Sequence, residues 1–166
     1  MQNYNSSSGF TLIELVVAMV IVGVISTLLI IYIMASTETF ISVQSRKSLN
    51  IDAASSIRLF TREVSLTNKI YTAIEKNFQF SSTIDTNMII DYFINNDGTF
   101  TRKRGAGNIE IVSKNVDFNS SYFNYYDIND NIGTPIRRIR LSLLLRINND
   151  SSRFTADIFP ETYKNE

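Results

Sequence analysis

The stretch FTLIELVVAMVIVGVISTLLIIYIM, from Phe10 to Met34, decides the fold, because it is an apolar run of 25 residues with one ionisable side chain, Glu14. As a helix rising about 1.5 Å per residue it is about 37 Å long, enough to cross a hydrocarbon core of about 30 Å with tilt. A secretory signal usually has a shorter apolar region, about 7–15 residues, after a basic segment, and here no Lys or Arg comes before the run. We therefore expect a membrane-spanning helix.

Glu14 raises the free energy of inserting this helix into a membrane. An acidic side chain at the centre of a membrane helix costs about 2.5 to 3.5 kcal/mol on insertion scales, and such residues normally have a partner. The first basic residue of the chain is Arg46, far beyond the three or four positions over which helical side chains meet. An α-amino group made by cutting the chain before Phe10 would supply a cation from a neighbouring subunit. We expect Glu14 to form half of an intermolecular ion pair.

The composition excludes most enzyme classes. The chain of 166 residues has 16 basic and 16 acidic residues, a formal net charge of zero, and neither Cys nor His. Disulfides, thiolates, imidazole bases and the commonest metal ligand are therefore absent. The carboxylates Glu63, Glu75, Asp91 and Glu110 show no paired spacing that suggests acid–base chemistry. We expect no enzymatic activity and no cofactor.

After the apolar run, a helical pattern continues to about Asn68. No Gly or Pro interrupts residues 24–70. Apolar residues recur at helical spacing, three or four positions apart, at Leu49, Ala53, Ile57, Phe60 and Val64. We predict one helix from residue 10 to residue 68, whose second half is amphipathic and packs on its own domain.

Beyond residue 69 the apolar period becomes two, which is typical of strands with one buried face. The segment Asn95–Gly98 separates two such runs and is suited to a tight hairpin turn. The fold class is therefore α+β, a long N-terminal helix packed on an antiparallel β-sheet. We expect four parts, residues 1–9, 10–34, 35–68 and 69–166. The predicted strands are 88–94, 99–103, 108–113, 115–127, 136–147 and 153–159.

The segment GFTLIEL, from Gly9 to Leu15, resembles the processing and assembly motif of type IV pilins and pseudopilins. In that family a prepilin peptidase cuts after the glycine and methylates the new N-terminal residue, here Phe10. Glu14 matches the glutamate that guides docking of subunits, and Gly23 matches a glycine of the family's membrane helix. The order of the late strands is similar to that of minor subunits of the J or W class.

Two features depart from the family pattern. The leader is uncharged, and the nearest basic residues, Arg46 and Lys47, lie beyond the apolar run, so the positive-inside rule gives no support for an N-terminus in the cytoplasm. Many major pilins also have a proline late in the membrane helix, whereas the first proline here is Pro135. Without that proline the helix should stay regular.

The resemblance implies a structural subunit of a type IV pilus, a type II secretion pseudopilus or a competence pilus. The expected partners are prepilin peptidase, other major and minor pilins or pseudopilins, an inner-membrane assembly platform and membrane lipid. The expected location is the inner membrane, with the C-terminal domain outside the cytoplasm, and then the filament. Two alternatives stay open: a DNA-receptor or adhesive pilin, and an unprocessed, single-span sensor.

Two further sites have ordinary explanations beside functional ones. The segment Asp127–Gly133 is rich in Asp and Asn, but an EF-hand needs Gly and Glu where Ile132 and Arg138 stand, so we expect a surface loop without metal. Basic residues on two strands are candidates for contacts with DNA phosphates, although charges on the wet face of a strand are common. These candidates are Arg102, Lys103, Arg104, Arg138 and Arg140.

Overall fold

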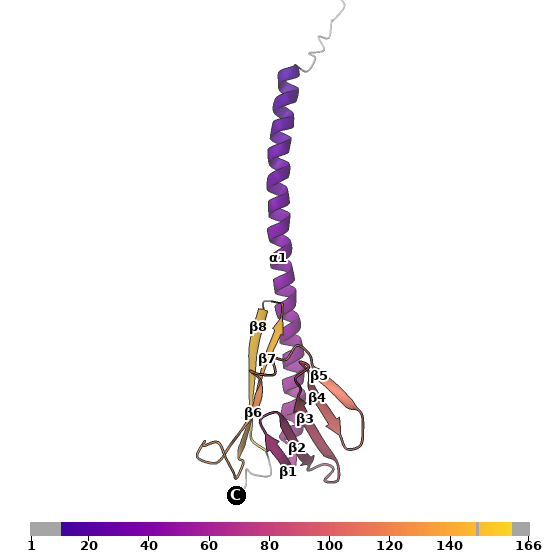
Figure 1. Ribbon diagram of the computed structural model, residues 1–166, viewed down its shortest axis with the longest axis vertical. Coiled ribbons are helices and arrows are strands. Elements are labelled where there is room, and N and C mark those ends of the chain that lie inside the picture. The colour runs from indigo at the N-terminus through magenta and orange to yellow at the C-terminus, as the bar shows by residue number, and fades with distance from the viewer. Residues whose placement is uncertain (1–10, 149, 161–166) are drawn as a thin grey trace, which may run out of the picture. The chain divides into compact units, whose positions relative to one another are not determined.

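The computed structural model describes residues 11–148 and 150–160, which contain one helix and eight strands (Figure 1). The helix α1 is Leu12–Val64. The chain divides into two compact units, residues 1–43 and 44–166. The strands are β1 (Thr67–Ile74), β2 (Asn77–Ser82), β3 (Ile89–Ile94), β4 (Phe100–Arg104), β5 (Ile109–Ser113), β6 (Tyr122–Tyr126), β7 (Arg138–Ile147) and β8 (Asp150–Ile158).

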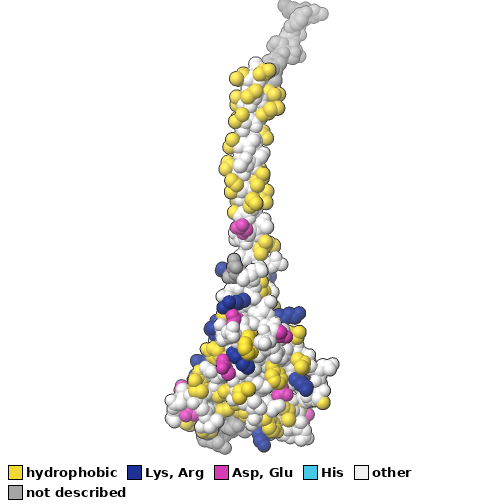
Figure 2. Space-filling view, viewed as in Figure 1, with side chains coloured by type: hydrophobic (Ala, Val, Ile, Leu, Met, Phe, Trp, Pro, Cys, Tyr) yellow, Lys and Arg dark blue, Asp and Glu magenta, His cyan; other side chains and the backbone are white. Residues whose placement is uncertain are grey.

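In the first unit, α1 exposes its apolar side chains on every side. Residues 11–41 are all exposed, and Figure 2 shows apolar side chains all along this part of the helix. The apolar segment is long enough to cross a membrane, and none of it is buried. A helix that is apolar all round must be buried in a larger core or in a membrane. The helix is also unbroken from Leu12 onward, as the missing proline predicted.

α1 ends at Val64, four residues before the predicted end at Asn68. The hydroxyl of Thr67 donates a hydrogen bond to the carbonyl of Val64 at 2.7 Å, and the Leu66 amide donates to the carbonyl of Glu63 at 3.2 Å. These bonds satisfy carbonyls that the end of a helix leaves without partners. Thr67 then begins β1, so the prediction of helix over the last four residues is wrong.

The strands form two antiparallel sheets, where the sequence predicted one. The first has the order β1-β2-β3-β4-β5, and the second has the order β6-β7-β8. The α+β class and the packing of the helix on antiparallel strands are confirmed. The turn at Asn95–Gly98 joins β3 to β4 as predicted, with Gly98 at φ 81°. This is a conformation in which a side chain is strained.

Two strands differ from the prediction for local reasons. The hairpin of β1 and β2 was missed, because two irregularities in its register disturb the alternation of apolar residues. The predicted strand 115–127 contains only β6. Before it, Asp117 accepts a hydrogen bond from the Ser120 amide at 3.0 Å, and Asn115 has φ 60°. Both features are typical of a turn, and Val116 makes only an isolated bridge to Leu145.

The predicted stripe of the second half of α1 is buried, apart from Ile57, which is half-buried. At its centre, Phe60 contacts rings of both sheets. Its ring centroid lies 5.0 Å from that of Tyr92 in β3 and 5.6 Å from that of Phe123 in β6. Replacing a buried Phe with Ala typically costs about 3–5 kcal/mol. Phe60 therefore holds the two sheets on one helix.

We predict that a fragment beginning at Ser36 is soluble, folded and monomeric. It lacks the apolar run but keeps every residue of the described core, which extends from Leu49 to Ile158. Circular dichroism should show both helix and sheet with one cooperative thermal transition, and light scattering should give the mass of a monomer. A disordered spectrum would contradict this account of the core.

Candidate functional site

The residues singled out from the sequence lie in different parts of the structure. Gly9 and Phe10, the predicted cleavage site, lie outside the described residues. Glu14 and Gly23 belong to α1. The five basic candidates lie on β4 and β7, which belong to different sheets.

Glu14 closes the first turn of α1. Its Oε2 atom accepts hydrogen bonds from the amide and from the hydroxyl of Thr11, both at 2.9 Å, and the Glu14 amide donates to the Thr11 hydroxyl at 3.4 Å. This is a capping box, in which Thr at the N-cap and Glu three residues later satisfy each other's amides. The pattern T-x-x-E is visible in the sequence, but its meaning was missed there.

The capping box stabilises the charged side chain of Glu14 within its own chain. The carboxylate lies at the positive end of the helix dipole and accepts two hydrogen bonds from its own chain. Both bonds reach Oε2, while Oε1 accepts none from the described residues. One carboxylate oxygen is therefore available to a donor from another molecule without loss of the cap.

No contact within the described chain requires a glycine at position 23. A Cβ atom placed on Gly23 would meet nothing within 4 Å. The Thr27 hydroxyl donates to the Gly23 carbonyl at 3.0 Å, so this polar side chain is satisfied along the helix. Any close approach that needs a glycine here must come from lipid or from another chain.

Arg102 and Arg104 belong to a buried ion cluster around Glu63, at the end of α1. Arg102 donates to Glu63 Oε1 at 2.7 Å and also binds Glu110, and Arg104 binds Glu63. Tyr92 donates its hydroxyl to Glu63 Oε2 at 2.6 Å. The side chains of Glu63 and Arg102 are 7% and 9% exposed. The cluster therefore fixes the end of the helix to β3 and β4.

Burial and neighbouring charges shift the pKa values of Tyr92 and Arg102. Burial, with the hydrogen bond to Glu63, raises the pKa of the Tyr92 hydroxyl, so it stays a proton donor. Burial alone would lower the pKa of Arg102, but the bond to Glu110 and the charge of Glu63 raise it.

On the second sheet, the basic candidates are also paired. Arg140 donates to both oxygens of Asp157, at 2.7 and 2.9 Å, and this bond lowers the pKa of Asp157. Arg138 pairs with Asp130 at 3.0 Å and lies over the ring of Tyr126, 4.2 Å from its centroid.

The basic candidates for contacts with DNA are mostly engaged by carboxylates of the same chain. Of the five candidates, only Lys103, which is half-buried, forms no ion pair with a described residue. Two aromatic residues of the same region, Phe123 and Tyr125, are buried and not open to stacking on bases. The carboxylates that bind the arginines would have to be displaced before phosphates could be bound.

The loop that invited a calcium interpretation is held by its own hydrogen bonds. Asp127 Oδ1 accepts from the amides of Asn129 and Asn131, at 2.8 and 2.9 Å, and Asp130 pairs with Arg138. Within residues 11–148 and 150–160, no group of three or more metal-binding side chains comes together. The expectation of a surface loop fits this geometry.

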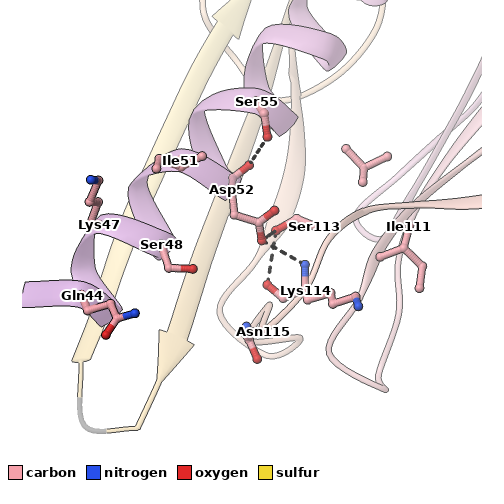
Figure 3. A pocket seen from close by; sticks show the side chains of 11 residues that line it. Gln44, Lys47, Ser48, Ile51, Asp52, Ser55, Ile111, Ser113, Lys114 and Asn115 are labelled. Carbon is pink, nitrogen blue, oxygen red and sulfur yellow. Dashed lines mark hydrogen bonds between the residues drawn. The ribbon is translucent and has the colours of Figure 1, made fainter. Parts of the chain in front are cut away.

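A groove of about 680 Å³ lies in the second unit, between α1 and residues 111–115 (Figure 3). Asp52, its only acidic residue, accepts hydrogen bonds from the Ser113 hydroxyl at 2.9 Å and from the Lys114 amide at 3.2 Å. Asp52 is therefore held by the chain at the end of β5.

The chain was compared with known proteins. Residues 4–30 match the family model described as the prokaryotic N-terminal methylation motif. No curated protein and no solved structure matches the chain. The N-terminal segment therefore carries a prepilin motif of the type found in type IV pilins and pseudopilins. This motif is typical of processed, pilin-like subunits, and the family that carries it is structural.

We predict that Glu63→Gln destabilises the fragment beginning at Ser36 by about 3–5 kcal/mol, because it removes the buried counter-charge of Arg102. Urea unfolding followed by circular dichroism measures this loss. Glu75→Gln is the matched control, since Glu75 is 65% exposed and pairs with Lys76 at the surface. It should cost less than about 1 kcal/mol. Equal losses in the two variants would show that the cluster has no special role.

Proposed function

We propose that this protein is a minor structural subunit of a type IV pilus, a type II secretion pseudopilus or a competence pilus. A prepilin peptidase would cut the precursor between Gly9 and Phe10 and methylate Phe10. The observation that carries the proposal is the prepilin motif at the start of a helix whose apolar first half is exposed throughout. A processed chain with such a helix has a surface that only lipid or other helices can cover.

The apolar segment would be covered first by lipid and later by the helices of other subunits. Before assembly, lipid would cover residues 10–34 in the inner membrane, while residues 35–68 and 69–166 would lie outside the cytoplasm. During assembly, with the help of an inner-membrane platform, the helices of other pilins would replace the lipid. Helices in membranes associate by close van der Waals packing and by hydrogen bonds between chains. An open surface at Gly23 is suited to such packing.

The geometry of Glu14 supports a role in docking. Oε2 is engaged by Thr11, and Oε1 is open to the ammonium group of a neighbouring subunit. The capping box would hold the carboxylate in place before docking, so that little side-chain freedom is lost when the pair forms. In low dielectric the pair is strong, and removing one partner is costly.

We predict that Gly9→Leu blocks cleavage and leaves the precursor in the membrane, because a peptidase that cuts after a glycine must hold that small residue closely. The experiment is expression in a host with a prepilin peptidase, followed by measurement of intact mass. Ser7→Leu is the matched control, with the same bulk two residues earlier, and should be processed. Normal cleavage of the Gly9 variant would contradict the assigned site.

We predict that Glu14→Gln is processed normally but assembles poorly. Gln also closes a capping box, so the start of the helix is kept and only the charge is lost. Loss of a buried counter-charge costs about 3–5 kcal/mol, so co-purification with partner pilins from detergent should fall by more than about tenfold. Glu14→Asp should restore part of it.

Glu38→Gln is the control for this prediction, because it makes the same change at an exposed residue of α1. It should assemble like the wild type. If the Glu14→Gln variant also assembles like the wild type at native expression levels, the intermolecular pair is not the function of Glu14.

A further inference from the structure

The groove between α1 and residues 111–115 borders one edge of the first sheet. β5 is the outermost strand on this side, with β4 as its strand neighbour. The side chains of Ile109 and Ile111, two residues apart on one face, are 64% and 55% exposed. An exposed edge strand with apolar side chains is a template for pairing with another chain.

α1 covers only the far end of this edge. The Ser56 hydroxyl donates to the carbonyl of Val112 at 2.9 Å, and Asp52 binds Ser113 and the Lys114 amide. These bonds close the edge at its C-terminal end, as the dashed lines at Asp52 show in Figure 3. Among the described residues, no further strand pairs with the other end, at Ile109–Ile111.

The opposite wall of the groove is a face of α1 with one apolar side chain. Ile51 is 61% exposed, and its helix neighbours Ser48 and Ser55 are small. Ile51 on this wall faces a groove whose other apolar lining residues are Ile111 and Val112, and the remaining lining residues are polar or charged. An apolar side chain that enters between Ile51 and Ile111 would lose water on two sides.

The unbalanced charge of the groove is positive. Lys47 and Lys114 both line it, and neither side chain forms an ion pair with a described residue. Against these two lysines the lining has one carboxylate, Asp52, which accepts hydrogen bonds from the end of β5, while Glu110 of β5 binds Arg102. A partner with carboxylates would match the groove, whereas a second copy that docked symmetrically through the same groove would bring the same two lysines.

We propose that this groove binds an extended segment of a different protein chain, in which an apolar side chain is flanked by carboxylates. The segment adds a strand beside Ile109–Ile111, its apolar side chain packs between Ile51 and Ile111, and its carboxylates reach Lys47 and Lys114. This is recognition by strand addition, in which the backbone supplies affinity and the side chains supply specificity. It does not depend on Glu14 or on cleavage.

The test uses the full chain in detergent micelles and a fluorescein-labelled peptide of alternating glutamate and isoleucine. Fluorescence anisotropy should show saturable binding that weakens at least about tenfold in the double variant Lys47→Glu, Lys114→Glu, because like charges now face each other. Ile111→Ser should weaken binding as well. Lys69→Glu and Ile128→Ser, exposed residues away from the groove, should bind like the wild type.

A peptide with lysine in place of glutamate should bind weakly or not at all. Equal binding of the two peptides, equal weakening by the control variants, or absence of saturable binding would overturn the proposal. Self-association of the chain that Ile111→Ser abolishes would assign the groove to a second copy and also overturn it. Glu14→Gln should bind the peptide normally, so failure of the filament proposal and failure of this one are distinguishable.

Discussion

The apolar first half of α1 has no cover within the described chain, and the rest of the structure depends on this constraint. Its side chains must meet lipid or the helices of other chains, because water is a poor solvent for them. The one acidic side chain of this stretch, Glu14, is held by Thr11 in a capping box. The start of the helix is thus stabilised by its own residues while one carboxylate oxygen remains open.

The second half of the same helix has the opposite character. Phe60 packs on rings from both sheets, and Glu63 binds Arg102, Arg104 and Tyr92. Arg102 and Arg104, which the sequence made candidates for contacts with DNA phosphates, bind Glu63 and hold the helix on the strands. Removing one charged residue from such a cluster costs far more folding stability than removing an ion pair at the surface. In the second unit, these charges therefore hold the helix on the strands.

Periodicity predicted the α+β class, the buried stripe of the helix and the strands β3, β4, β5, β7 and β8. It failed where local irregularity hides the period, as in the β1–β2 hairpin with its shifted register. The capping box was visible as T-x-x-E near residue 11. By contrast, Glu63 meets Arg102 across 39 residues of chain, and no short-range pattern reveals a contact that the tertiary fold creates.

The central claim is that the chain is trimmed before Phe10 and carries its new amine into an assembly. Intact-mass measurement of the protein from filaments or from the native membrane tests this most directly. The account predicts a chain that begins at Phe10 and carries one added methyl group. A chain in assembled material that still begins at Met1 would contradict it.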